Sequence, residues 1–401
     1  MTAATQAGPP PGRPGYGLFL AVAAIPTAAL AFSTWVVRAQ GLVTMGGHLV
    51  VVRDYLWVWA AGHLLRAGDV ATIFQPFVFA DRLRGLFGAG LDNHVWSYPP
   101  SMLLLAVPAG YLPLVAGDAV YALAQILLLW LIGRGAGLPL AVRLAVLASP
   151  ALLENALGGQ NGAMTAALLV GGLMLADRRP VLAGVLFGLL TVKPQLGLIV
   201  PVCLLASRNW KAIATAAAVA AALLLLSVAA FGFDSWRLFV ANTMPYASIV
   251  LQQPWNGSYY QTTMVTPFMA LRLFDVGLLP ARVLQGFASM AALVVAWRLW
   301  RRPAADPAAR MAVTSALGLL ATPYALNYDM IAVTTGIACL AVDRRARVAS
   351  PWETLALASG WLWPGVAFVA VGAGGLPLGP LVLAAVAWVG WRRLDAAPVV
   401  A

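Results

Sequence analysis

Long apolar blocks, separated by short polar or basic segments, make up most of this chain. Blocks rich in Leu, Ala and Val recur along it, many of them about 15 to 23 residues long. At 1.5 Å of rise per residue, a helix of this length matches a hydrocarbon layer about 30 Å thick. A transmembrane barrel would instead show short segments of alternating hydrophobicity. The pattern therefore predicts an all-α integral membrane protein, a bundle of several membrane-spanning helices.

The composition agrees with this prediction and changes how the charge is interpreted. With 61% hydrophobic and 10% charged residues and a mean hydropathy of +0.84, the chain has more apolar surface than a soluble core of 401 residues could bury. The formal net charge is +11, but most basic residues stand in short loops between apolar blocks. Their positions therefore indicate which loops face the cytoplasm, and we expect no nucleic-acid partner.

The basic clusters predict the topology. They contain Arg178 and Arg179, Arg208 and Lys211, Arg298 to Arg310, Arg344 to Arg347, and Arg392 and Arg393. By the positive-inside rule these clusters are cytoplasmic. Counting outward from them gives about twelve spans, the first from about 17 to 37, in one transmembrane domain over 1–401. Residues 1–15 are expected to be a disordered tail, and 40–116 and 233–276 to be outer segments with interfacial helices.

The block 99–116 is not needed for this count. Pro108, Gly110 and Pro113 interrupt it, and about 15 helical residues would reach only about 22 Å. We expect a re-entrant or interface-lying helix here. The block 139–156, in contrast, is expected to be one span.

Polar residues that carry chemistry are rare, and this topology places them on one side. They are Asp54, Glu154, Asn155, Gln160, Asn161, Lys193, Gln195, Asn327 and Asp329. Polar groups near a membrane are costly unless they are paired or line a wet cavity, so the clustering indicates a cavity on the outer face. The alternative is that they only sit at interface depth, where the cost is low.

Asp54 stands at the start of a predicted short helix, from about Asp54 to Arg66, that ends at Gly68. Aromatic residues, including Trp57, follow it and are typical of a membrane interface. Asp54 is a candidate catalytic carboxylate. A structural alternative is a pair with Arg53, or an acid favoured by the helix dipole.

Lys193 is followed by a proline at the predicted far side of two spans. It is either a cation for a phosphate group or a lysine that extends to the interface. Tyr98 precedes two prolines and could mark only a helix start, and Gly158 to Asn161 could be only a tight turn. The loop 252–262, with Asn256 and Tyr259, is rich in amides and aromatics, which suits sugars and also any interface loop.

The sequence does not contain the motifs of several other kinds of functional site. His63 and His94 have no partner at metal-ligand spacing, so we expect no metal site and no cofactor. Phosphate-binding glycine loops, nucleophile elbows and zinc-protease motifs are not found in the sequence. Cys203 and Cys339 lie in apolar blocks and are expected to be ordinary packing residues.

The order of the motifs over residues 50–345 resembles glycosyltransferase family 87, polyprenyl-phosphate-mannose-dependent enzymes of the GT-C membrane superfamily. The matching stretches are YLWVWAAGHLLRAGD with Asp54, Tyr98 with its two prolines, Gly159 to Asn161, and AGVLFGLLTVKPQ with Lys193. The resemblance implies a GT-C-type helical bundle with juxtamembrane helices on the outer face. One departure is the stretch TPYALNYDM, where members acting on mycobacterial glycolipids look to carry histidines.

The resemblance also implies the chemistry: inverting transfer of a hexose, usually mannose, from a polyprenyl-phosphate donor to a lipid or glycan acceptor, in a bacterial inner membrane. Asp54 occupies the position of the catalytic acid residue and would act as general base. The expected donor-binding residues are Lys193, Tyr98, Gln160, Asn161 and Asn327. The expected acceptor or sugar contacts are Trp57, His63, Asn256, Tyr259 and Asp329. The alternatives are a transporter or flippase for a lipid-linked or anionic solute and a non-catalytic scaffold subunit.

Overall fold

The computed structural model describes residues 54–88, 91, 95–342 and 350–394, with short stretches at 24–25, 27–29, 32, 44–45 and 48–49. The predicted tail at 1–15, most of the first predicted span, Arg53, His94 and the basic cluster at 344–347 lie outside the described residues.

The described chain is almost entirely helical, as the hydropathy pattern predicts. The exception is one antiparallel pair of two-residue strands, β1 (Thr44–Met45) and β2 (His48–Leu49). The first helices are α2 (Tyr55–Arg66), α3 (Val70–Ile73), α4 (Pro76–Phe87), η1 (Pro100–Met102), α5 (Leu103–Ala106), η2 (Pro108–Tyr111), α6 (Leu114–Gly135), α7 (Leu140–Leu147), α8 (Pro150–Leu157), α9 (Gly162–Leu175), α10 (Pro180–Leu189), η3 (Leu190–Val192), η4 (Pro194–Gly197), α11 (Val200–Ala206) and α12 (Trp210–Phe231). They are followed by α13 (Phe233–Leu238), η5 (Phe239–Thr243), α14 (Met244–Gln252), α15 (Tyr259–Thr262), α16 (Pro267–Arg272), α17 (Leu278–Trp300), α18 (Pro307–Ala321), η6 (Asn327–Met330), α19 (Ile331–Val342), α20 (Pro351–Gly372) and α21 (Gly379–Arg392).

Several of these helices are suited to a membrane. Among the described residues, α6, α12, α17 and α20 are long and apolar enough to cross one, and the bent pair of α7 and α8 would make a fifth span. Seven further apolar helical stretches are shorter, at 10–17 residues. The membrane character is thus confirmed, but these lengths do not confirm the predicted number of twelve spans.

The block 139–156, predicted as one span, corresponds to two short helices, α7 and α8, that are bent against each other. The chain bends by 49° between α7 and α8. Pro150 lacks a backbone N–H and stands in the first turn of α8, and the Ser149 side chain accepts a hydrogen bond from the N–H of Leu152. A proline preceded by a capping serine starts a new helix, so the apolar block is divided here.

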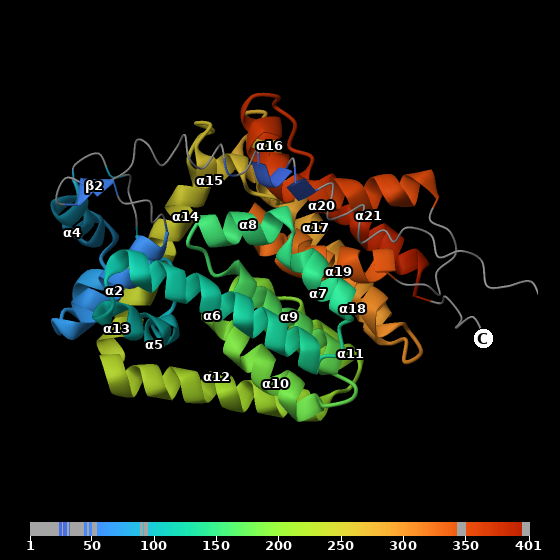
Figure 1. Ribbon diagram of the computed structural model, residues 1–401, viewed down its shortest axis with the longest axis horizontal. Helices are drawn as coiled ribbons and strands as arrows, with labels where there is room; N and C mark the ends of the chain where they lie inside the picture. The colour runs from blue at the N-terminus through green and yellow to red at the C-terminus, as the bar shows by residue number, and fades with distance from the viewer. Residues whose placement is uncertain are drawn as a thin grey trace, which may run out of the picture.

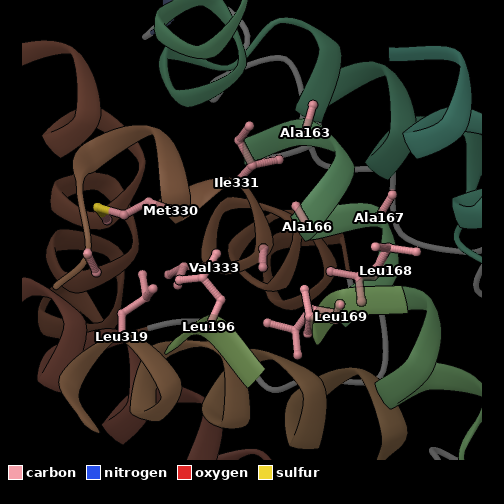
Figure 2. Close-up of a cluster of buried hydrophobic side chains, with 14 of the residues drawn as sticks. Ala163, Ala166, Ala167, Leu168, Leu169, Leu196, Leu319, Met330, Ile331 and Val333 are labelled. Atoms are coloured by element: carbon pink, nitrogen blue, oxygen red, sulfur yellow. The ribbon is translucent and has the colours of Figure 1, made fainter. Parts of the chain in front are cut away.

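A fully buried helix, α9, forms the centre of the bundle. All of its residues are buried, and a helix that is apolar on every side belongs in a core. Figure 2 shows side chains of α9, among them Ala166 and Leu169, in one buried cluster with side chains from other segments. These include Leu196 of η4 and Ile331 of α19. The apolar core therefore contains side chains of α9, η4 and α19. Each of these helices begins directly after one of the polar segments described below.

Short helices gather at one end of the molecule, where α2, α4, α5 and α13 lie together at the left of Figure 1. The Asn242 side chain donates a hydrogen bond to the carbonyl of Phe74 at 3.1 Å, and the rings of Phe74 and Phe239 meet edge to face. The two predicted outer segments, 40–116 and 233–276, are thus in contact with each other.

The segment 99–116 is a separate short helical stretch, as its prolines and glycine predict. It consists of η1, α5 and η2, Leu112 is extended, and the last residues of the predicted block, 114–116, already belong to α6. This stretch packs tightly against α2: a Cβ added to Gly62 would lie 2.4 Å from the Ala106 carbonyl oxygen and from the Gly110 nitrogen. Two backbones can approach this closely only where both residues lack a side chain.

We predict that Gly62→Ala lowers the free energy of unfolding by about 1–3 kcal/mol, because the added methyl group has to push two backbones apart. Thermal unfolding of the detergent-solubilised protein measures this effect. Gly85→Ala, on the exposed side of α4 with open space around its Cβ position, is the matched control. It should leave stability unchanged or raise it slightly, since alanine favours a helix, and equal losses in both variants would contradict the packing argument.

Candidate active site

Asp54 lies at the N-terminal end of α2, half-buried. Its side chain does not cap the helix. Its backbone N–H instead donates a hydrogen bond to the Gly158 carbonyl at 3.1 Å, and its carboxylate oxygen Oδ2 accepts a hydrogen bond from Nε2 of Gln160. Both the backbone and the side chain of Asp54 are therefore held by the turn that connects α8 and α9.

This turn, residues 158–161, fits closely against the start of α2. Gly159 has φ of +63°, and a Cβ at this position would lie 2.6 Å from the Tyr55 backbone nitrogen. Glycine adopts a positive φ without strain and leaves room for the neighbouring chain. The sequence interpretation of these residues as a tight turn is correct, and the turn also contacts the candidate catalytic residue.

Gln125 of α6 holds the turn from the other side. Its side-chain Nε2 donates to the Gln160 carbonyl at 2.9 Å, and its Oε1 accepts from the backbone N–H of Met164 at 3.3 Å. Gln125 is buried, and both ends of its amide are satisfied, which is what a buried polar group requires.

Lys193 lies in the break between η3 and η4, with its ammonium group directed at the turn and at η6. Nζ donates to Asn161 Oδ1 at 3.1 Å and to Asp329 Oδ1 at 2.6 Å, and it lies 4.9 Å from the centre of the Tyr328 ring. The side chains of Lys193 and Asp329 are 2% and 0% exposed. The lysine is therefore part of a buried ion pair, with its positive charge matched by Asp329.

Asp329 is also held by backbone. Its second oxygen, Oδ2, accepts from the N–H of Leu326 at 3.1 Å and so fixes the start of η6. The neighbouring Asn327 is fully buried; its amide nitrogen donates to the Pro364 carbonyl of α20 at 3.0 Å and its oxygen accepts from the Tyr328 N–H at 2.9 Å. In this structure Asn327 is thus engaged with the protein itself.

These contacts form one continuous path. It runs from Asp54 through the adjacent residues Gln160 and Asn161 to Lys193 and then Asp329. The sequence analysis identifies these five residues as separate candidates. The fold brings them together from four segments of the chain.

Tyrosines surround this path. Burial raises the pKa of the Tyr98 phenol well above its usual range, and the nearby phenols of Tyr121 and Tyr324 and the carboxylates of Asp54 and Asp329 raise it further. Burial likewise raises the pKa of Tyr324 to about 12, against the lowering effect of a hydrogen bond with Tyr260 and with Asp329 and Asp54 adding to the rise. Both phenols stay protonated at neutral pH, so they are available as hydrogen-bond donors near two carboxylates.

The second outer segment reaches the same region through Tyr259. Its hydroxyl donates to Glu154 Oε2 at 2.8 Å, and Glu154 is on α8, four residues before Gly158. Asn256 is exposed in the same loop, where its side chain accepts from the N–H of Ser258 at 2.9 Å.

The structure separates His63 from the rest of the set. Nine residues along α2 from Asp54, at 3.6 residues per turn, place His63 on the opposite side of the helix. Its ring lies against the Trp59 ring, with 3.7 Å between centres and a tilt of 34°, and its Nδ1 contacts the Trp59 carbonyl at 3.0 Å. Trp57, three residues after Asp54, is half-buried on the same side of α2 as the carboxylate.

Within the described ranges, no three side chains of His, Cys, Asp or Glu form a group that could hold a metal ion.

Sequence reasoning missed Gln125 and Tyr324 as parts of this site. Gln125 had a usable signal, since a lone amide inside an apolar helix is costly unless it has a partner. Tyr324 had none, because a tyrosine in a loop after a helix is common.

Comparison with known proteins supports the family resemblance. The model of glycosyltransferase family 87 matches residues 96–323. The matched range includes Tyr98, the turn at 158–161 and Lys193, while Asp54 and Asp329 lie outside it. No curated protein and no solved structure matches the chain.

The apolar helices of the fold and the motifs of the site agree with this match, which spans more than half of the chain. The protein therefore belongs to glycosyltransferase family 87 and is a membrane enzyme that transfers a sugar.

Proposed function

We propose that this enzyme transfers a hexose, with mannose as the first candidate, from a polyprenyl-phosphate donor to a hydroxyl group of a lipid or glycan acceptor. The reaction takes place at the outer face of a bacterial inner membrane and inverts the anomeric carbon. The observation that carries the proposal is the path from Asp54 through the turn at 158–161 to Lys193 and Asp329. It presents a carboxylate on a rigid support in an apolar protein, which suits a general base.

Asp54 acts as the general base. The acceptor hydroxyl loses its proton to the carboxylate while its oxygen forms a bond to the anomeric carbon of the donor sugar. The bond from that carbon to the phosphate oxygen breaks, and its electron pair leaves with the polyprenyl phosphate. The departing phosphate is stable as an anion, so no acid is required, whereas a retaining glycoside hydrolase would need a second carboxylate about 5 Å away.

The hydrogen bond from Gln160 supports this role. An amide donor favours the ionised form of a carboxylate and restricts its orientation. Asp329, the nearby second carboxylate, is fully buried and paired with Lys193, so it is poorly placed to take the acceptor's proton.

The surrounding groups supply the substrate contacts in this proposal. Tyr98 donates to sugar or phosphate oxygens, since its phenol stays protonated. Trp57 offers an aromatic face on the side of α2 that carries Asp54, which suits stacking on a sugar ring. Tyr259 and Asn256 approach from the second outer segment.

We predict that Asp54→Asn lowers the transfer rate by about 10²- to 10⁴-fold, the usual contribution of a general base, while donor affinity changes little. The measurement is transfer of radiolabelled mannose from polyprenyl phosphate in proteoliposomes, with a total lipid extract of the producing cells as the source of acceptor. Donor affinity is measured by a scintillation proximity assay.

The matched control is Asp81→Asn, which removes an exposed carboxylate from neighbouring α4. It should keep transfer within about twofold of the unaltered protein, because exposed ion pairs contribute little. Near-normal turnover in Asp54→Asn would remove Asp54 from the role of base.

The fate of the donor separates transfer from transport. A transporter or flippase would gain support from the broken helices near Pro150 and Pro194, but family membership indicates sugar transfer. We expect the labelled hexose to appear on a new product and polyprenyl phosphate to accumulate. Movement of intact donor between leaflets without product would refute the transferase mechanism.

We also predict the orientation. Asn256→Cys should react with a membrane-impermeant thiol reagent added outside intact cells, whereas Ala304→Cys, in the basic turn between α17 and α18, should react only after permeabilisation. Both positions are exposed, and the two native cysteines are buried. Labelling of both variants from the same side would contradict the predicted topology.

A further inference from the structure

The environment of Lys193 differs from that expected of a lysine that binds a phosphate group. Its ammonium group is buried, is 2.6 Å from a carboxylate oxygen and 3.1 Å from an amide oxygen, and lies against a tyrosine ring. Asn161 and Asp329 take two of its three N–H donors, and the Lys193 side chain is 2% exposed. A phosphate group that replaced Asp329 as the partner of this cation would leave that carboxylate buried without its counter-ion. Such an exchange is costly in a low-dielectric site.

The partners of Lys193 are themselves anchored. Asp329 also accepts from the backbone of Leu326 and thus fixes the start of η6. Asn161 begins α9, and its backbone carbonyl accepts from the N–H of Thr165 at 3.1 Å. Lys193 therefore joins three chain segments at the points where each one enters the apolar core.

One residue connects this ion pair to Asp54. Gln160, adjacent to Asn161, donates to the Asp54 carboxylate. The same turn accepts the Asp54 backbone N–H through Gly158, and at Gly159 it packs against Tyr55. A shift of the turn would thus move both the backbone and the carboxylate of Asp54, and such displacements are costly in catalysis, with about a hundredfold loss of rate per ångström.

We propose that Lys193 and Asp329 form a positioning pair for Asp54. The pair holds the turn at 158–161 in register with α2, and so aims the Asp54 carboxylate at the acceptor hydroxyl. Neither side chain contacts the substrates. This inference rests on the proposed role of Asp54 as general base.

The presence of a buried ion pair at this position fits this role. Apolar residues of similar volume would often stabilise a core as well as an ion pair does. An ion pair adds direction, because the ammonium group has to face both Asn161 and Asp329 at hydrogen-bond distance. Orientation of the turn is thus the property that the pair contributes.

The test uses four variants of the full-length protein in proteoliposomes: Lys193→Met, Asp329→Asn, the double variant and Lys193→Arg. The transfer assay gives kcat, a scintillation proximity assay with radiolabelled polyprenyl-phosphate-mannose gives donor Kd, and thermal unfolding reports folding. The control is Arg393→Met, which breaks a similar buried pair with Glu353 at the ends of α20 and α21.

We expect Lys193→Met and Asp329→Asn each to lower kcat by about a hundredfold with donor Kd within about threefold, the expected cost of a misplaced base. The double variant should be no slower than either single one, since the turn is already released. Lys193→Arg should recover part of the rate because it keeps the charge. Arg393→Met should lower the unfolding temperature and leave kcat of the folded protein unchanged.

Different results would overturn the inference. If Lys193→Met raises donor Kd by tenfold or more while Asp329→Asn leaves it unchanged or lowers it, Lys193 binds the donor phosphate. If Lys193→Met does not fold, Asp329→Asn and Lys193→Arg decide: an unchanged kcat in Asp329→Asn rejects the positioning role. An inactive Asp54→Asn together with fast Lys193 and Asp329 variants rejects only the pair, whereas an active Asp54→Asn rejects the proposed base itself.

Discussion

The close packing of one short turn between two other segments is the constraint on which the site depends. At Gly159 the turn touches the backbone of Tyr55, and at Gly162 a Cβ would lie 2.5 Å from the Tyr328 carbonyl oxygen. Side chains at either position would separate α2 or η6 from the turn. The absence of these side chains lets the chain next to Asp54 pack against the turn, and the chain next to Asp329 pack against the first residue of α9, directly after the turn.

The apolar core beneath the turn makes this arrangement rigid. Helix α9 leaves the turn and is buried on every side, and it packs against η4 and α19, the segments that follow Lys193 and Asp329 (Figure 2). Directly above this core the polar side chains satisfy one another. In a low-dielectric environment such a network is strong when it is complete and costly when a partner is lost. The site is therefore preorganised by packing from below and by hydrogen bonds from within.

The hydrogen-bonded path extends beyond the part of the chain that the family model matches. The matched range contains the turn and Lys193, but the carboxylates at both ends of the hydrogen-bonded path lie outside it. The fold unites the two parts, because α2 and η6 both dock on the matched core. A membrane sugar transferase has to hold its polar groups on a hydrophobic scaffold without exposing them to lipid, and a turn at the end of a buried helix achieves this.

The sequence by itself determined the helical class, the membrane character and many helix limits, since these follow from local hydropathy, glycines and prolines. The range of α2 was predicted closely, with Gly68 at φ of +74° just beyond its end. The sequence also identified most of the polar residues of the site as candidates, because polar groups are rare in so apolar a chain. Only the tertiary structure decided their partners: Lys193 and Asp329 are 136 residues apart, and no local pattern encodes that contact. His63 is different, because helical periodicity within α2 already places it on the other side of the helix from Asp54. Hydropathy is a property of each residue alone, whereas a hydrogen bond depends on where two segments meet in space.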